Sequence, residues 1–206
     1  MRYDLLACAL VAALPATAEP RFEARATALG LTHAYTGGWE HFVGGGVATF
    51  DCDGDALPEL YLAGGDSPAT LLRNTSTPGT LRFAPDTPDA LALTGVTGAY
   101  PLDIDSDGQT DLAVLRVGAN RLMRGLGDCA FAPFDDLALP ADAGWSTAFS
   151  ATWEAGQSLP TLAVGNYVDR DDPDGPFEAC DDSLLYRPKG AGYGPPLPLR
   201  PGYCPL

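Results

Sequence analysis

Basic residues are scarce in this chain of 206 residues. It has 12 lysines and arginines against 27 aspartates and glutamates, for a formal net charge of −15. Nucleic acids and anionic membrane surfaces are both held by clustered Lys and Arg, so the charge balance argues against either partner. It favours divalent cations wherever the acids cluster. Sustained helical periodicity is also missing, and 24 glycines with 19 prolines argue against a long helical bundle.

Common catalytic and zinc-binding signatures are absent too. The chain has no G-x-S-x-G, HExxH or Walker A motif and no Cys or His spacing typical of zinc. His33 and His41 lie on either side of Glu40, and such a pair is able to do general acid–base work. Because no nucleophile motif accompanies them, surface or strand-end histidines are the simpler interpretation. We therefore expect no catalytic residues and no enzyme activity.

The first 18 residues are typical of a secretory signal. An apolar run at residues 5–14 follows Arg2, and small residues at 16–18 precede the expected cleavage after about Ala18. The run is too short to span a bilayer, so we expect no stable membrane insertion. The predicted location is secreted, either extracellular or periplasmic.

Cysteine content fits that location. Loss of Cys8 with the signal leaves Cys52, Cys129, Cys180 and Cys204. Four cysteines in an oxidising compartment predict two disulfides, with three possible connectivities. Cys180 and Cys204 share the Pro-rich end of the chain and are the favoured pair, which leaves Cys52 with Cys129.

The body of the chain repeats. Residues 50–62, 102–114 and 152–164 align without gaps, at a period near 50. Such a period indicates stacked supersecondary units, in a propeller or a solenoid. Each unit contains a strand of small residues, a loop, an apolar strand and two further strands, which is one propeller blade of four antiparallel strands. We predict an all-β fold, an incomplete β-propeller of about three blades.

The expected organisation has three parts. A signal peptide at residues 1–18 precedes blades at residues 19–168. Residues 169–206 form a Pro/Gly-rich, disulfide-strapped tail or insertion leading to a missing next blade. Since closed propellers have about four to eight blades, we expect a truncated gene product or fragment whose open blade faces are able to associate.

The loops of the first two repeats carry the predicted chemistry. Their acids alternate with other residues, and four carboxylates in one tight loop repel one another strongly without a cation. Ca²⁺ takes six to eight oxygen ligands, and every side-chain ligand here is oxygen. The first loop is expected to be the poorer one, because Ala56 replaces the turn glycine and the longer Glu59 replaces Asp. The predicted Ca²⁺ ligands are Asp51, Asp53, Asp55, the Leu57 carbonyl and Glu59 in the first loop, and Asp103, Asp105, Asp107, the Gln109 carbonyl and Asp111 in the second.

Residue types and spacing exclude an EF-hand and also exclude metal binding by the third loop. An EF-hand needs Glu at position 12 and flanking helices, but Leu62 and Val114 stand there and the flanks are predicted strands. The third loop has Ala155, Gln157 and Thr161 in place of acids, so it is expected to keep the blade fold and bind no metal.

The acidic loops resemble FG-GAP/VCBS repeats of integrin-α-like propellers. Residues 44–51, 71–74 and 164–167 are similar to the cartilage acidic protein and ASPIC/UnbV type of secreted proteins. This resemblance implies a seven-bladed-type propeller in an extracellular location. It suggests a calcium-binding module that serves binding or adhesion, with structural ions and an unidentified extracellular protein or glycan ligand. The alternative is a propeller-fold enzyme acting on carbohydrate or another extracellular substrate.

Overall fold

The computed structural model describes residues 21–27, 29–137, 139–140, 144–173, 175 and 179–199. The predicted signal peptide and Cys204 lie outside these residues. Within the described ranges, no helix combines the length and the apolar character needed to cross a membrane.

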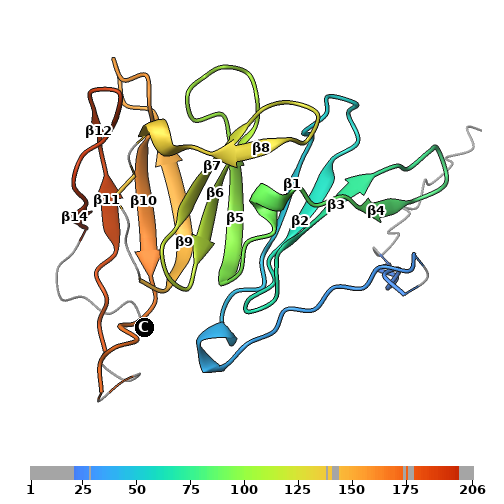
Figure 1. Cartoon of the computed structure of the whole chain (residues 1–206), viewed down its shortest axis with the longest axis horizontal. Coiled ribbons are helices and arrows are strands. Elements are labelled where there is room, and N and C mark those ends of the chain that lie inside the picture. The colour runs from blue at the N-terminus through green and yellow to red at the C-terminus, as the bar shows by residue number, and fades with distance from the viewer. Residues whose placement is uncertain are drawn as a thin grey trace, which may run out of the picture.

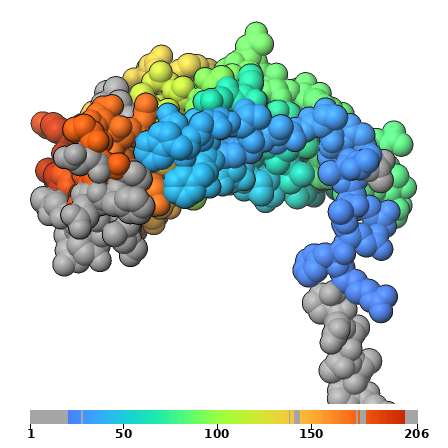
Figure 2. All heavy atoms as spheres, turned by 90° about the horizontal axis from the view of Figure 1, so that it is seen from below, coloured from blue at the N-terminus to red at the C-terminus, as the bar shows by residue number. Residues whose placement is uncertain are grey.

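Three four-stranded antiparallel sheets stand side by side in an arc (Figures 1 and 2). The first strands of the sheets contact one another in succession, β1 with β5 and β5 with β9. These sheets are hereafter blades 1, 2 and 3, and they confirm the predicted all-β class and four-stranded unit. Blade 1 contains β1 (Val47–Phe50), β2 (Glu59–Leu62), β3 (Thr70–Asn74) and β4 (Phe83–Pro85); blade 2 contains β5 (Val96–Leu102), β6 (Asp111–Arg116), β7 (Arg121–Gly125) and β8 (Phe131–Pro133); blade 3 contains β9 (Ser146–Thr152), β10 (Thr161–Asn166), β11 (Leu184–Tyr186) and β14 (Leu197–Pro198).

Short elements connect and flank the blades. The two-stranded pair of β12 (Pro188–Lys189) and β13 (Gly192–Tyr193) lies between β11 and β14 along the chain. Three single-turn 3₁₀ helices are η1 (Trp39–His41), η2 (Asp89–Leu91) and η3 (Asp135–Leu137).

The third blade extends beyond the boundary predicted at residue 168. Its outer strands β11 and β14 come from the stretch assigned to a tail, and β11 pairs with β10 through Leu162↔Tyr186. A long segment, residues 167–183, separates β10 from β11, whereas blades 1 and 2 place their third strand within a few residues of the second. That insertion shifts the outer strands out of phase with the repeat, which is why the period did not reveal them.

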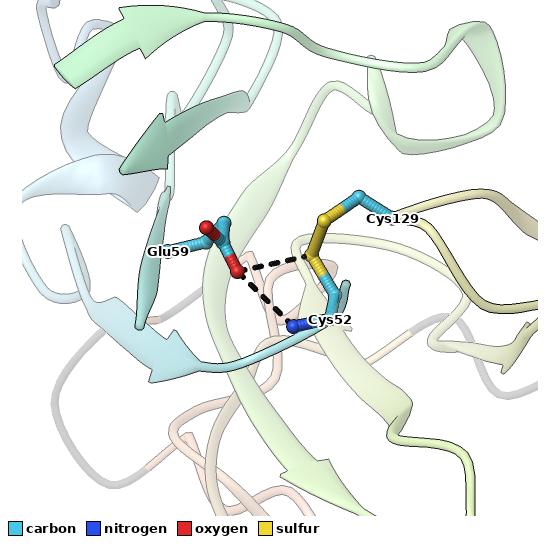
Figure 3. A group of neighbouring side chains, drawn as sticks. All are labelled: Cys52, Glu59 and Cys129. Carbon is cyan, nitrogen blue, oxygen red and sulfur yellow. Dashed lines mark hydrogen bonds between the residues drawn. A yellow bond between two sulfur atoms is a disulfide. The ribbon is translucent and has the colours of Figure 1, made fainter. Parts of the chain in front are cut away.

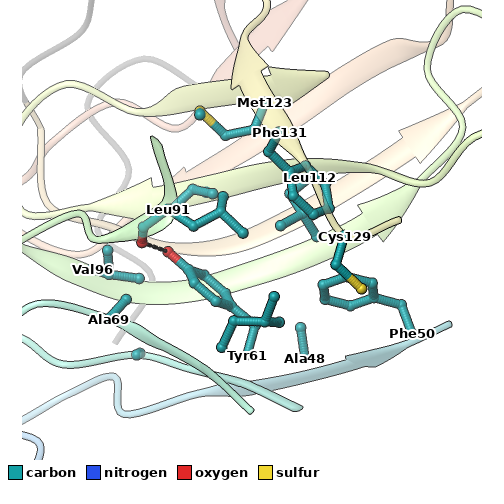
Figure 4. Close-up of a cluster of buried hydrophobic side chains, with 13 residues drawn as sticks. Ala48, Phe50, Tyr61, Ala69, Leu91, Val96, Leu112, Met123, Cys129 and Phe131 are labelled. Atoms are coloured by element: carbon teal, nitrogen blue, oxygen red, sulfur yellow. Dashed lines mark hydrogen bonds between the residues drawn. The ribbon is translucent and has the colours of Figure 1, made fainter. Parts of the chain in front are cut away.

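Blade 2 is covered on both faces because the side chains of its central strand alternate. In β6, Leu112 and Val114 point into one buried cluster, and Ala113 and Leu115 point into another. This period of two is that of a β-strand between two packed layers. The first cluster includes Phe50, Tyr61, Leu71, Leu91, Met123 and Phe131, and joins blade 2 to blade 1 (Figure 4); the second includes Phe134, Leu162, Val164 and Tyr186, and joins it to blade 3.

A disulfide also joins blades 1 and 2. Cys52 in the first acidic loop is bonded to Cys129 in the turn between β7 and β8, as predicted, with Cα atoms 4.7 Å apart. The backbone N–H of Cys129 donates to the carbonyl of Cys52 over 3.0 Å. Cys180 is disulfide-bonded as well, and its predicted partner Cys204 lies outside the described residues.

Removing the link between the blades should cost stability. The bond closes a sequence separation of 77 residues, and a crosslink of that span stabilises a fold by about 2–5 kcal/mol, chiefly by restricting the unfolded chain. The double variant Cys52→Ala/Cys129→Ala is therefore expected to lower the free energy of unfolding by that amount in urea denaturation. An unchanged midpoint and slope would show that the link between blades 1 and 2 contributes nothing.

Candidate metal centre

The first acidic loop connects β1 to β2 and folds around the carboxylate of Asp51. This carboxylate accepts backbone N–H bonds from Gly54 over 2.7 Å and from Ala56 over 2.9 Å. These bonds, the one from Ala56 above all, lower the pKa of Asp51 below its ordinary value. Asp55 accepts the N–H of Leu57 over 2.7 Å. The loop thus curls around its own acids, as Asp-rich turns do.

The second loop, between β5 and β6, repeats this arrangement. Asp103 accepts backbone N–H bonds from Asp107 and Gly108, both over 3.0 Å. Asp107 accepts the N–H of Gln109 over 2.8 Å, as Asp55 does from Leu57. With Asp51 and Asp103 counted as position 1 of their loops, the carboxylates at positions 1 and 5 accept backbone N–H bonds in the same way in both loops.

The ninth position of each loop holds a fully buried carboxylate, Glu59 or Asp111. Glu59 accepts the N–H of Cys52 over 3.0 Å and that of Asn74, at the end of β3, over 3.2 Å. Asp111 accepts the N–H of Ile104 over 2.8 Å and that of Gly125, at the end of β7, over 2.8 Å. Each carboxylate ties its loop to the third strand of its own blade, and the longer Glu59 side chain makes the same pair of contacts as Asp111.

Glu59 also lies against the disulfide (Figure 3). One of its carboxylate oxygens is 3.4 Å from the sulfur of Cys52. A disulfide sulfur carries no proton and is not a thiolate, so this approach is a packing contact, and neither cysteine is available as a metal ligand. The group Cys52, Glu59 and Cys129 is therefore not a metal site despite its closeness.

Three of the four predicted carboxylates come together in each loop. Oxygens of Asp51, Asp53 and Glu59 lie within 4.8 Å of one another, and so do those of Asp103, Asp105 and Asp111. The fourth acid of each loop, Asp55 or Asp107, is outside this close group and is bonded to the loop backbone. Leu57 and Gln109, predicted to offer carbonyls, are the residues whose N–H groups those acids bind.

Each loop also faces an arginine from the third strand of its blade, a contact the sequence did not predict. Arg73 in β3 pairs with Asp53 over 2.7 Å, and Arg124 in β7 lies 3.7 Å from Asp105. Both arginines also pair with an acid beyond the fourth strand, Asp86 or Asp136. Their recurrence one repeat apart was the available signal, but it suggested only a solvated or packing role.

The donor chemistry fits a hard divalent cation. Each loop brings four carboxylates against one guanidinium, so negative charge remains in excess. Burial raises the pKa of Asp111, two backbone hydrogen bonds oppose this rise, and the charges of Asp105 and Asp107 add to it. A cation among these oxygens would remove that repulsion, and all-oxygen sites suit Ca²⁺ rather than softer metals.

The third loop has a different internal bond. Thr161, at the ninth position, donates its hydroxyl to Glu154 over 2.7 Å. A neutral hydroxyl thus replaces the buried carboxylate, and the acid has moved to the second position. The close groups of metal-type ligands found among the described residues include none from this loop.

The two histidines lie outside the acidic loops. The His33 ring lies 2.8 Å from the carbonyl of Ala63 and 3.2 Å from the hydroxyl of Thr70. His41, expected at the surface or a strand end, is buried instead, with 8 % exposure. The reason is that the segment before β1 packs back onto blade 1, where Thr36 forms a parallel bridge with Gly65.

A family model matches the part of the chain that holds the two acidic loops. Residues 51–114 match the family model of the FG-GAP-like repeat. The match starts at the first acid of the first loop and ends in β6, so it contains both acidic loops and all of blade 1 after β1. A search of curated proteins gives no match.

Two non-glycine residues of the loops have left-handed backbone conformations. Ala56 has φ 66° and Ser106 has φ 62°, at positions where the other loop has Gly108 and Gly54. A side chain in this conformation is strained by about 1–2 kcal/mol, of which the added freedom of glycine in the unfolded chain offsets part.

We expect Ala56→Gly and Ser106→Gly each to raise the free energy of unfolding by up to about 1 kcal/mol, measured by urea denaturation. Gly108→Ala is the matched control and should lower the free energy of unfolding by a similar amount, because φ is 88° there. An added Cβ would meet nothing within 4 Å, so backbone strain would be the only cost. Destabilisation by both glycine substitutions would show that these loops are not folded as described.

Proposed function

We propose that this chain is a calcium-stabilised propeller segment that serves as a secreted binding or adhesion module. The FG-GAP-like match and the four-stranded blades support a β-propeller module of this kind. The observation that carries the calcium assignment is the convergence of three carboxylates in each of two loops at the same end of adjacent blades.

The residues that would hold the ions are Asp51, Asp53 and Glu59 in blade 1, and Asp103, Asp105 and Asp111 in blade 2. The ion would supply charge neutralisation and nothing else, because its role is structural. Each loop joins the first two strands of a blade, and its ninth residue is bonded to the third strand. Holding the loop therefore fixes three strands against one another.

The partner of the module is proposed to be an extracellular protein or glycan. Export is supported by the disulfide between Cys52 and Cys129, since such bonds persist mainly in oxidising compartments. Blade 1 also exposes apolar side chains that a partner could cover, Val47 in β1 and Leu81 between β3 and β4, which are 56 % and 52 % exposed.

Calcium should stabilise the fold by mass action. A ligand at about 100 times its dissociation constant adds about 2.7 kcal/mol per site. We therefore expect a clear rise in melting temperature in millimolar Ca²⁺ relative to EGTA, measured by calorimetry. Asp105→Asn should remove the contribution of one site, and Gln157→Ala, in the third loop, should leave the full calcium response. Identical melting curves with Ca²⁺ and EGTA would contradict the proposal.

A second candidate function is a propeller-fold enzyme, and one observation favours it. Nδ1 of His41 lies 3.6 Å from a carboxylate oxygen of Asp66, and a histidine beside a carboxylate is able to transfer protons. If the chain turns over an extracellular substrate such as a carbohydrate, His41→Gln should abolish turnover while leaving calcium stabilisation unchanged.

A further inference from the structure

A hollow of about 380 Å³ lies at the end of the blades opposite to the acidic loops. Arg116 in its wall ends β6 and pairs with Val96, the first residue of β5. The acidic loop of the same blade follows Leu102, at the other end of β5. The N-terminal segment, blue in Figure 2, runs across the underside of the blades and supplies Glu40 and His41 to the wall.

His41 is the unusual residue in this wall. Its side chain is only 5 % exposed, and neither ring nitrogen has a hydrogen-bond partner among the described residues. The nearest charged group is a carboxylate oxygen of Asp66, 3.6 Å from Nδ1, which is too long for a hydrogen bond. Buried polar groups are nearly always hydrogen-bonded, so an imidazole that lines a hollow without such a bond points to a partner that enters the hollow.

The position of this imidazole is fixed by its surroundings. A Cβ on Gly37 would collide with Nδ1 of His41, and a Cβ on Gly65 would lie 3.2 Å from its Cδ2. The ring of Tyr35 meets the imidazole edge-on, with centroids 5.9 Å apart. Two glycines with positive φ, at 141° and 63°, thus form a cradle for the ring.

Two arginines provide positive charge in the hollow of a strongly acidic protein. Arg116 donates from Nε to the carbonyl of Thr94 over 2.8 Å and from Nη1 to that of Ala119 over 2.9 Å. These bonds fix the guanidinium and leave its other N–H groups without a partner among the described residues. Burial lowers the pKa of Arg116, and a partly desolvated guanidinium gains more from a carboxylate than one in water. Arg170 is exposed and lines the same hollow.

Two carboxylates in the same wall restrict what the arginines would accept. Glu40 and Asp66 would repel a multiply charged anion such as phosphate. They are acceptors for hydroxyl or ammonium groups, and the two ring nitrogens of His41 add further hydrogen-bonding capacity. A divalent cation is disfavoured by the two guanidiniums, and the close groups of metal-type ligands among the described residues do not include His41.

We propose that this hollow binds a small polar ligand that carries one carboxylate together with hydroxyl or amino groups. Arg116 and Arg170 hold the carboxylate, and His41, Asp66 and Glu40 bond the remaining polar groups. Sugar acids and free amino acids share this chemistry. The site does not depend on calcium binding, since it lies at the other end of the blades.

The test is titration of the full chain with D-glucuronate, L-serine, D-glucose and inorganic phosphate, followed by NMR of the imidazole signals. The chain has two histidines. We expect glucuronate or serine to shift the His41 signals, with the ligand that binds identifying the donor groups as hydroxyl or amino. His33 is the internal control, because both of its ring nitrogens already lie near partners.

Two arginine variants distinguish binding at a specific site from a general effect of protein charge on ligand affinity. Arg170→Ala should weaken binding at least about tenfold, the usual scale for loss of a charged hydrogen bond. Arg82→Ala removes the same charge from an exposed turn in blade 1 and should leave the affinity unchanged. The proposal is overturned if neither carboxylate ligand binds at 20 mM, if glucose or phosphate binds more tightly than both, or if the two arginine variants behave alike.

Discussion

The structure depends on the concentration of negative charge in two tight hairpins, each closed by a buried carboxylate. Glu59 and Asp111 are completely inaccessible and accept two backbone N–H groups each, one from the loop and one from the end of the third strand. Burial of a carboxylate is costly unless it is well bonded. Each of these two acids therefore holds three strands together and also lies next to two further carboxylates of its loop.

Other contacts extend from these joints to the neighbouring blade. Arg73 links Asp53 of the first loop to Asp128 in the turn of blade 2, where the next residue, Cys129, is bonded to Cys52. An ion pair, a disulfide and the apolar cluster around Phe50 and Phe131 thus meet beside one acidic loop. Ordering of this loop therefore also orders the boundary between blades 1 and 2.

The sequence was sufficient to predict the features set by local pattern. The repeat of strand, acidic loop and strand gave the all-β class, the blades and the placement of both loops, and elimination gave the Cys52–Cys129 pair. Long-range features escaped it. The outer strands of blade 3 lie beyond an insertion that breaks the period, and the burial of His41 depends on a segment folding back onto blade 1. The pairing of Arg73 and Arg124 with loop acids required knowing which face of β3 and β7 turns toward the loops.

The most direct test of the account is the number of calcium ions bound per chain, determined by equilibrium dialysis and elemental analysis. The account predicts two ions for the native sequence and one for Asp103→Asn, because the three acidic oxygens that meet in blade 2 would be reduced to two. Binding of no ion, or an ion count unaffected by this substitution, would contradict the assignment of the two hairpins as cation sites.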